Sequence, residues 1–241
     1  MKISSQTSPD RTPVPNWKRG LDIGMVILAL PLLIPLALVL AVIIRLVSKG
    51  PVLFKQERVG RGGQKFLCYK FRTMFVGAES RSHEGHLHQL IHSDAPMTKM
   101  DDRGDSRIIP FGVFLRASGL DELPQLINVV KGEMSIVGPR PCLPYEFEHY
   151  LSWQRERCEA TPGLTGLWQV SGKNSTTFSE MIRLDIEYSR HCTLMLDLEI
   201  IFRTVPVLLG QVSKTRKNAK PARKIIAVEP ETIFHAPIIN R

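Results

Sequence analysis

The chain is short of cysteine and of acidic residues. Its 241 residues include four cysteines, and no two of them form a C-x-x-C pair. The wide spacing of Cys68, Cys142, Cys158 and Cys192 favours free thiols in a reducing compartment over a disulfide framework. Lys and Arg number 32 against 23 Asp and Glu, which gives a net charge of +9. Such a surface favours anionic partners, namely phosphates, nucleic acids or acidic lipids.

No internal repeat is apparent, and no metal-binding motif is complete. The polar stretch 76–109 carries four histidines: His83, His86, His88 and His92. The H-E-x-x-H zinc motif fails because Leu87 stands where its second histidine would be. His88 and His92 are spaced i, i+4, but no cysteine or placed carboxylate accompanies them. We therefore favour a polar surface helix and loop here over a zinc site.

Charge is absent from Ile23 to Ile44. These 22 residues are enough to cross a bilayer at about 1.5 Å of rise per residue. The run is too long for the apolar region of a signal peptide, and no small-x-small cleavage site follows it. Pro31 and Pro35 lie near its middle, and each favours a kink. The run predicts a membrane helix that bends at its prolines.

Positive charge flanks this apolar run at both ends. The basic residues are Lys18, Arg19, Arg45 and Lys49. A spanning helix usually shows its basic excess on the cytoplasmic side only. We therefore predict a re-entrant helix that enters one leaflet, bends as a kinked helix and returns. Asp22 would then lie at the interface near Arg19. A single-span anchor stays open as the alternative, because prolines do occur in spanning helices.

Beyond this segment the sequence predicts an α+β domain that is mainly helical. Extended runs over 52–54 and 65–71 flank the glycine-rich turn 60–63, which indicates a small β-hairpin. Helices are expected over 121–130, 144–159, 178–190 and 194–209. The first of these is expected to end at Lys131-Gly132. Pro162 to Gly172 predicts a turn, a short extended run and another turn.

Two parts of this domain have more than one interpretation. Basic residues crowd the hairpin: Lys55, Arg58, Arg61, Lys65, Lys70 and Arg72. They could touch lipid head groups or form a solvated basic face, and charge alone leaves both open. The apolar face of the 194–209 helix could likewise be an amphipathic surface in the membrane interface or pack into the core.

The two ends of the chain differ in composition from its middle. Residues 1–16 predict a disordered tail. Residues 211–241 carry seven Lys or Arg and two Asp or Glu, which predicts a flexible basic tail against anionic lipid. Few aromatic residues interleave there, so no nucleic acid is expected as a partner. Residues 17–48 are expected to form the re-entrant helix and residues 49–210 the folded domain that follows it.

Asp121 and Glu122 are the candidate catalytic residues. The simplest interpretation is structural, because Asp is a favoured N-cap and Glu next to it complements the helix dipole. A helix start also receives phosphate, and Mg²⁺ could bridge that phosphate to a carboxylate. Arg116 and Arg140, the latter held between two prolines, can clamp phosphate oxygens. Adjacent helical side chains point about 100° apart, so one carboxylate can attack phosphorus while the other assists.

An ordered set of motifs resembles the bacterial sugar transferases, the monotopic phosphoglycosyl transferases that start exopolysaccharide and glycoconjugate synthesis. The resemblance runs from about Lys18 to Gly210. In chain order the motifs are Lys18-Arg19 with Asp22, Gln56–Gly60, Tyr69–Met74, Leu120–Leu126, Lys131–Pro141, Pro162–Gly166 and Asp185. Chance does not produce such an ordered set.

The resemblance implies an activity and a location. The chain would transfer a hexose-1-phosphate from a UDP-sugar to undecaprenyl phosphate and release UMP, at the cytoplasmic face of the bacterial inner membrane. Asp121 would attack the β-phosphorus, form a covalent aspartyl sugar-phosphate and bind Mg²⁺, the implied cofactor. Glu122 would be its companion carboxylate, and residues 49–210 would be a cytoplasmic catalytic domain. Membrane lipids are further partners, and a homodimer or downstream glycosyltransferases are left open.

Other site residues follow from their positions in the motifs. Phosphate binding is implied for Lys70, Arg72, Arg116, Gly138, Pro139, Arg140 and Pro141. The nucleotide or sugar side is implied for Thr165, Gly166 and Asp185. The membrane bend falls on Pro31 and Pro35, where Ile34-Pro35 replaces the Ser-Pro pair common in the family. Two other functions stay open: a membrane-anchored glycosyltransferase that releases UDP, and a non-enzymatic basic membrane scaffold.

Overall fold

A computed structural model describes residues 14–77, 96, 105, 107–172 and 175–218. The predicted histidine cluster, most of the N-terminal tail and residues 219–241 lie outside the described residues. In chain order the elements are α1 (Asn16–Val47), β1 (Leu53–Val59), η1 (Arg61–Gly63), β2 (Lys65–Phe71), α3 (Gly112–Ser118), η3 (Leu120–Gln125), α4 (Leu126–Lys131), β3 (Ser135–Val137), α5 (Pro144–Glu148), η4 (Ser152–Glu159), β4 (Gly163–Thr165), α6 (Leu167–Val170), α7 (Phe178–Arg190) and α8 (Leu194–Asn218). Helices dominate, which confirms the mainly helical class.

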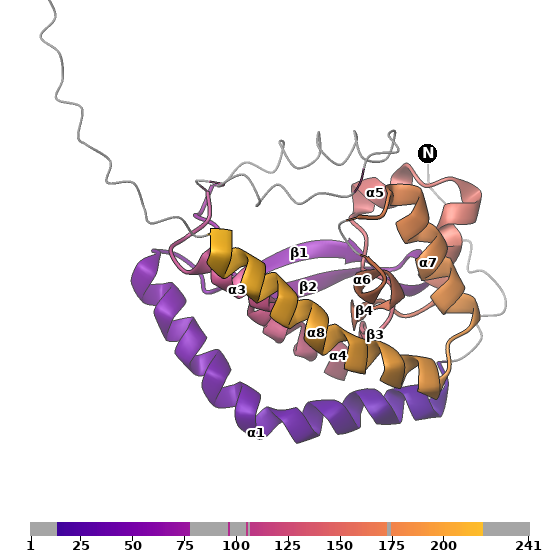
Figure 1. The fold of residues 1–241 in the computed structure, drawn as a ribbon, viewed down its shortest axis with the longest axis horizontal. Coiled ribbons are helices and arrows are strands. Elements are labelled where there is room, and N and C mark those ends of the chain that lie inside the picture. Colours follow the sequence, from indigo (N-terminus) through magenta and orange to yellow (C-terminus); the bar gives the residue numbers. More distant parts are fainter. Residues whose placement is uncertain (1–13, 78–95, 97–104, 106, 173–174, 219–241) are drawn as a thin grey trace, which may run out of the picture.

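β1 and β2 form the predicted antiparallel hairpin (Figure 1). Leu53 pairs with Phe71 at its open end and Val59 with Lys65 at the turn, where η1 reverses the chain. β1 is longer than the predicted run 52–54 because its pairing continues up to the turn. β2 packs against η3 and α4, so the hairpin supports the segment that carries Asp121.

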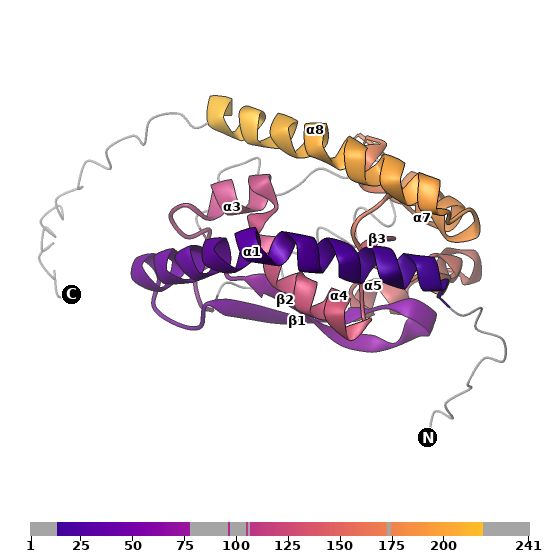
Figure 2. The same cartoon turned by 90° about the horizontal axis from the view of Figure 1, so that it is seen from below.

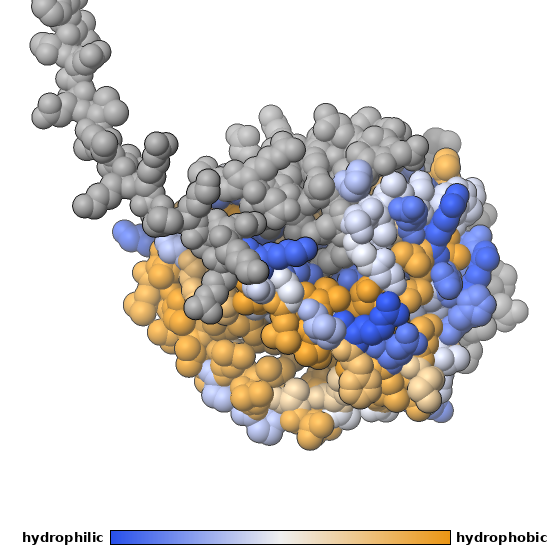
Figure 3. Space-filling view, in the orientation of Figure 1, coloured by the Kyte–Doolittle hydropathy of each residue, from blue (hydrophilic) through white to orange (hydrophobic). Residues whose placement is uncertain are grey.

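α1 is one continuous helix that is bent near its middle (Figure 1). Pro31 and Pro35 lie inside it, and the hydrogen bonds they remove account for the bend. It is long and apolar enough to cross a membrane, with a mean hydropathy of 3.1 over its most apolar 18 residues. Leu28 is 84% exposed and Leu46 80%. Hydrophobic surface covers the arm that leads to the C-terminal end of α1 (Figure 3).

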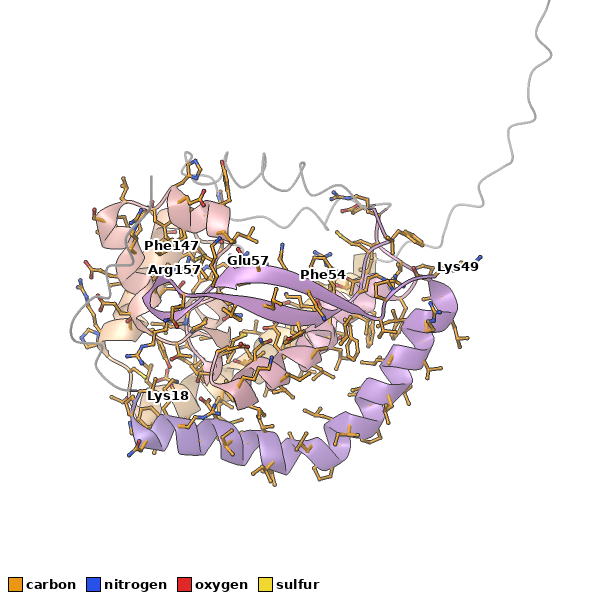
Figure 4. The ribbon with its side chains drawn as sticks, turned by 180° about the vertical axis from the view of Figure 1, so that it is seen from behind. Lys18, Lys49, Phe54, Glu57, Phe147 and Arg157 are labelled. Atoms are coloured by element: carbon orange, nitrogen blue, oxygen red, sulfur yellow. The ribbon has the colours of Figure 1, made fainter. Side chains whose placement is uncertain are left out.

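The N-terminal end of α1 is fastened to the domain by buried polar groups. The Lys18 ammonium lies 2.6 Å from an Asp197 carboxylate oxygen and donates to the Tyr188 hydroxyl and the Val137 carbonyl at 2.8 and 2.9 Å. Figure 4 shows Lys18 against the body of the molecule and Lys49 at the opposite end of α1. Lys18 is therefore a core residue, although the sequence predicts a flanking charge of the membrane segment.

Asp22 and Arg19 also bind protein. Asp22 accepts hydrogen bonds from the Ser135 hydroxyl and the Ile136 N–H, both at 2.8 Å, and is 3% exposed. Arg19 donates to the carbonyls of Val129 and Val130 at the end of α4. The carboxylate of Asp22 thus binds β3, where the sequence predicts a residue at the membrane interface near Arg19. Lys18 and Arg19 bind protein groups, so they no longer count as basic residues that flank a membrane segment. The support that charge gives to a re-entrant helix is weaker by these two residues.

A second, parallel pair of strands joins distant parts of the chain. Ser135 of β3 pairs with Gly163 of β4, and Val137 pairs with Thr165. The two backbones come so close that a Cβ on Gly163 would lie 2.1 Å from the Gly138 nitrogen. The sequence predicts an extended run near β4 but not its partner, since each strand has only three residues.

The helices after β3 follow the predictions in part. The helix predicted over 144–159 is two short elements, α5 and η4, because each starts with its own side-chain cap: Glu146 accepts from the Leu143 N–H, and Gln154 from the Leu151 N–H. α7 has the predicted bounds, 178–190, and a capping box formed by Thr177 and Glu180.

α8 has one buried face and one exposed face. Ile200 is fully buried, whereas Phe202 is 74% exposed and Leu209 66%. Core packing is thus confirmed for one face, and the other remains available to an apolar partner. The helix continues past residue 210, so residues 211–218 of the predicted tail are helical. Seen from below, α8 and the hairpin lie on opposite sides of α1 (Figure 2).

Candidate active site

Asp121 and Glu122 lie in η3, which links α3 to α4. α3 ends at Gly119, whose φ of 72° turns the chain directly into η3. Gly119 is also the N-cap of η3, and Gln125 is the N-cap of α4. The interpretation of Asp121 as an N-cap is therefore wrong. The predicted helix over 121–130 is split in two, and it ends at Gly132 as expected, with φ of 80°.

Lys70 holds Glu122. The two charged groups are 2.6 Å apart, with 26% of the lysine side chain and 36% of the glutamate side chain exposed. A half-exposed pair of this kind contributes little to stability, so its main effect is on geometry. Lys70 is predicted as a phosphate ligand. In the structure it instead contacts Glu122, the carboxylate next to Asp121.

Lys70→Met is expected to lower turnover by about 100-fold, because a carboxylate displaced by an ångström can cost that much. The change in the free energy of unfolding should stay within about 1 kcal/mol. Steady-state kinetics and thermal unfolding measure both quantities. Lys65→Met is the matched control, since it removes the exposed ion pair with Glu57 on the same hairpin. Equal activity of the two variants would contradict the role given to Lys70.

The predicted phosphate loop, residues 138–141, is packed tightly against β4. The Gly138 N–H donates to the Thr165 carbonyl at 2.8 Å. A Cβ on Gly166 would lie 2.2 Å from the Gly138 carbonyl oxygen. The Thr165 hydroxyl lies 2.7 Å from that of Thr204 in α8. Thr165 and Gly166, predicted on the nucleotide or sugar side, are therefore buried and support the loop through contacts with Gly138.

Arg140 projects from this loop and is held by Glu146. The guanidinium lies 3.1 Å from a carboxylate oxygen of Glu146, which is fully buried, while 26% of the arginine side chain is exposed. Glu146 raises the pKa of Arg140. Burial acts to raise the pKa of Glu146, but Arg140, Arg58 and Arg157 outweigh it and leave that pKa below its usual range. Sequence reasoning missed Glu146, whose one local signal is its place three residues after the helix-capping position, Leu143.

Asp185 contacts the phosphate loop indirectly, through Arg157. It is 1% exposed and forms an ion pair with the equally buried Arg157. Burial raises the pKa of Asp185, and Arg157 opposes this. Arg157 in turn donates to the Arg140 carbonyl at 2.9 Å and to the Tyr150 hydroxyl at 2.6 Å. The structure therefore connects Asp185 to the site through Arg157, which the sequence did not single out.

Two predicted phosphate ligands have other neighbours. Arg72 is 6% exposed and donates to the carbonyls of Ser48 and Lys49 at 2.7 and 2.9 Å, so it fastens the end of α1. Arg116 lies in the last turn of α3. Its charge is one of the smaller causes that lower the pKa of Asp105 to about 2, the largest being the hydrogen bond from Arg107.

The hairpin brings the carboxylate pair and the Arg140 loop together. Cys68 of β2 is 1% exposed, and burial raises the pKa of its thiol. The charges of Lys70, Arg58 and Arg140 lower this pKa, whereas the charge of Glu122 raises it. Glu122 and Arg140 therefore lie within electrostatic reach of one buried side chain. The two segments therefore contact the same hairpin, Glu122 through Lys70 of β2 and the loop through Arg58 of β1.

The donor atoms of Asp121 and Glu122 are of the kind that Mg²⁺ prefers. Among the described residues, no three His, Cys, Asp or Glu side chains gather to hold a metal. Asp121 and Glu122 offer two carboxylates, and Mg²⁺ commonly uses one or two together with substrate phosphates and waters. Their donor set is suited to such a shared ion and not to a cage made by the protein alone.

Comparison with known proteins identifies the family. The family model described as "Bacterial sugar transferase" matches residues 14–211. The exopolysaccharide production protein ExoY of Sinorhizobium fredii is 38% identical over 191 residues, which cover 79% of this chain and 84% of ExoY. The UDP-glucose:undecaprenyl-phosphate glucose-1-phosphate transferase of Caulobacter vibrioides is 41% identical over 207 residues, 83% of this chain and 72% of that protein. The galactosyl transferase CpsE of Streptococcus agalactiae is 43% identical over 195 residues, 80% of this chain but 42% of CpsE, so the chain spans less than half of that relative. This chain belongs to the bacterial sugar transferase family.

Proposed function

We propose that the chain transfers a hexose-1-phosphate from a UDP-sugar to undecaprenyl phosphate and releases UMP. The observation that carries the proposal is that the Asp121-Glu122 pair and the Arg140 loop both bind the same β-hairpin, through Lys70 and Arg58 respectively. The names of the relatives support the substrates, since the Caulobacter protein is named for transfer of glucose-1-phosphate to undecaprenyl phosphate.

The reaction has two displacements at one phosphorus atom. A carboxylate oxygen of Asp121 attacks the β-phosphorus of the UDP-sugar, the bond to the bridging oxygen breaks, and UMP leaves with the electron pair. The sugar-phosphate is then esterified to Asp121. A phosphate oxygen of undecaprenyl phosphate attacks the same phosphorus and expels the carboxylate, which yields undecaprenyl diphosphate-sugar.

The side chains around Asp121 supply position and charge. A carboxylate is a weak nucleophile, so the barrier must fall through orientation and neutralisation of the diphosphate. Arg140, oriented by Glu146, meets the phosphate oxygens, and Lys70 fixes Glu122. Asp121 and Glu122 would hold Mg²⁺, which when bound neutralises charge on the diphosphate.

The nucleotide product tests this proposal. Membranes that contain the chain, given a panel of UDP-sugars and undecaprenyl phosphate, are expected to release UMP in amounts equal to the lipid product. A glycosyltransferase, which moves the sugar alone, would release UDP. Chromatography of the nucleotides separates the two. Turnover that yields UDP and no UMP would contradict the proposal.

We also propose that α1 is re-entrant and places the site at the cytoplasmic face of the inner membrane. The bend at its prolines and its exposed leucines support this topology, as does the outward face of α8 with Phe202 and Leu209. The phosphate of the lipid acceptor lies at the membrane surface. A shallow anchor would hold the active site at the level of that phosphate.

Reporter tags distinguish the two topologies of α1. Tags at both termini are expected to be cytoplasmic, because a re-entrant helix returns to the leaflet that it enters. A spanning helix would put the N-terminal tag in the periplasm. Labelling of intact and permeabilised cells with a membrane-impermeant reagent measures the side, and labelling of the N-terminus in intact cells would contradict the re-entrant helix.

A further inference from the structure

We infer that Arg58 and Arg157 are positioning residues that hold the carbonyl groups of the Arg140 loop away from the bound phosphate. The inference deepens the proposed function and rests on it, because it takes the loop to be the phosphate site. Neither residue belongs to the set that the sequence assigns to the site.

Each guanidinium binds one carbonyl of the loop. Arg58 donates to the Pro141 carbonyl at 3.0 Å, and Arg157 donates to the Arg140 carbonyl at 2.9 Å. They approach from different elements, Arg58 from β1 and Arg157 from η4. In Figure 4, Arg157 lies near the closed end of the hairpin. Two successive peptide units are thus fixed by donors that come from the protein interior.

The carbonyl that precedes these two in the loop is also bound by a donor outside the loop. The Pro139 carbonyl accepts from the Gly163 N–H of β4 at 2.9 Å. Three consecutive carbonyl oxygens, from residues 139 to 141, therefore point to donors of the surrounding fold. A carbonyl oxygen carries partial negative charge and would repel a phosphate. All three carbonyl oxygens are thus bound by protein donors. The charged group that the loop offers to a ligand is the guanidinium of Arg140, whose side chain is partly exposed.

The loop depends on these donors because of its prolines. Pro139 and Pro141 have no N–H, so two of its four residues cannot fix the backbone by donating hydrogen bonds. The guanidinium groups of Arg58 and Arg157 supply the missing constraint from outside the loop. An arginine fork suits this task better than an ammonium, because its donors have fixed directions.

The charges of this cluster also favour an anion. Arg58 is 8% exposed, and its two hydrogen bonds end on neutral oxygen atoms, those of Pro141 and the Gln56 amide at 2.7 Å. Burial lowers the pKa of Arg58, and the charge of Arg140 lowers it further, whereas the charge of Glu146 raises it. The three guanidinium groups of this cluster, those of Arg58, Arg140 and Arg157, share the two carboxylates of Glu146 and Asp185, which leaves a net positive charge. An anion at the loop would balance that charge.

Arg58→Gln tests the inference with inorganic pyrophosphate as the probe. The affinity of the full chain for pyrophosphate is expected to fall about tenfold, and KM for the UDP-sugar to rise by a similar factor, because loss of a charged hydrogen bond has that magnitude. The melting temperature should fall by only a few degrees, because the variant loses one buried hydrogen bond and one of the three cations near Glu146. Arg190→Gln, which breaks the exposed pair with Glu156, is the control and should bind pyrophosphate as the wild type does.

Two further results keep the test decisive. If Arg58→Gln does not fold, Arg58→Lys keeps the charge and loses the fork, and it is expected to show the same loss of pyrophosphate affinity. Wild-type affinity in a folded Arg58 variant would overturn the inference. Wild-type protein that releases no UMP would instead contradict the proposed function, so the two failures are distinguishable.

Discussion

Asp121→Asn is expected to abolish turnover and leave the fold intact. A carboxamide has no anionic oxygen to attack phosphorus, so we expect the rate to fall by about 10⁴-fold or more, as for other nucleophiles. Asn has nearly the same shape as Asp, and Asp121 is 9% exposed in a short segment supported by β2. UMP release measures the loss, and circular dichroism measures the fold.

Glu122→Gln separates the roles of the two carboxylates. Glu122 is held by Lys70, so its removal should slow the reaction less than removal of Asp121 and leave measurable turnover. If Asp121→Asn retained wild-type turnover, Asp121 would not be the nucleophile. The pair would then be structural, and a different group would have to attack the phosphorus.

Lys18→Met is expected to have the largest effect on stability. It leaves Asp197, 1% exposed, as a buried carboxylate without its cation, and it also removes donors from Tyr188 and the Val137 carbonyl. Breaking one side of such a pair costs about 3–5 kcal/mol. Chemical unfolding of the full chain in detergent or nanodiscs measures the change.

The control for Lys18 is at the other end of the same helix. Lys49 is exposed, and Lys49→Met should change the free energy of unfolding by no more than about 0.5 kcal/mol. Removing both charges, with Lys18→Met and Asp197→Leu together, should restore part of the lost stability. A Lys18→Met protein as stable as wild type would show that this end of α1 is an anchor only.

The Lys18 contacts also join the membrane helix to the phosphate loop. Val137, whose carbonyl accepts from Lys18 at 2.9 Å, directly precedes Gly138. Asp22 binds Ser135 and Ile136, the other two residues of β3. The first turns of α1 thus hold β3 along its whole length. They are part of the framework of the site as well as part of the membrane anchor.

The elements that the sequence predicts well have strong local signals. A glycine-rich turn between two apolar runs predicts the hairpin, and the pattern over 178–190 predicts α7. The parallel pair of β3 and β4 has no such signal, because its partners, Ser135 and Gly163, are distant in sequence and each strand is three residues long. The split of 144–159 depends on two side-chain caps that compete with one continuous helix.

The site shows a similar division. Motif order identifies Asp121, Glu122 and Arg140, but their supporting residues depend on burial. Lys18 looks like a flanking basic residue in the sequence, yet it is 3% exposed in the structure. Charge alone does not reveal such burial, since the paired Asp197 lies in another helix, 179 positions away. Arg58 and Arg157 were missed for the same reason.

The most direct test of the covalent mechanism is the mass of the protein after incubation with a UDP-sugar in the absence of the lipid acceptor. We predict an adduct equal to one sugar-phosphate, which peptide mapping assigns to Asp121 and which disappears when undecaprenyl phosphate is added. The adduct should be missing from Asp121→Asn. UMP release at the normal rate with no adduct, or an adduct on a different residue, would contradict Asp121 as the nucleophile.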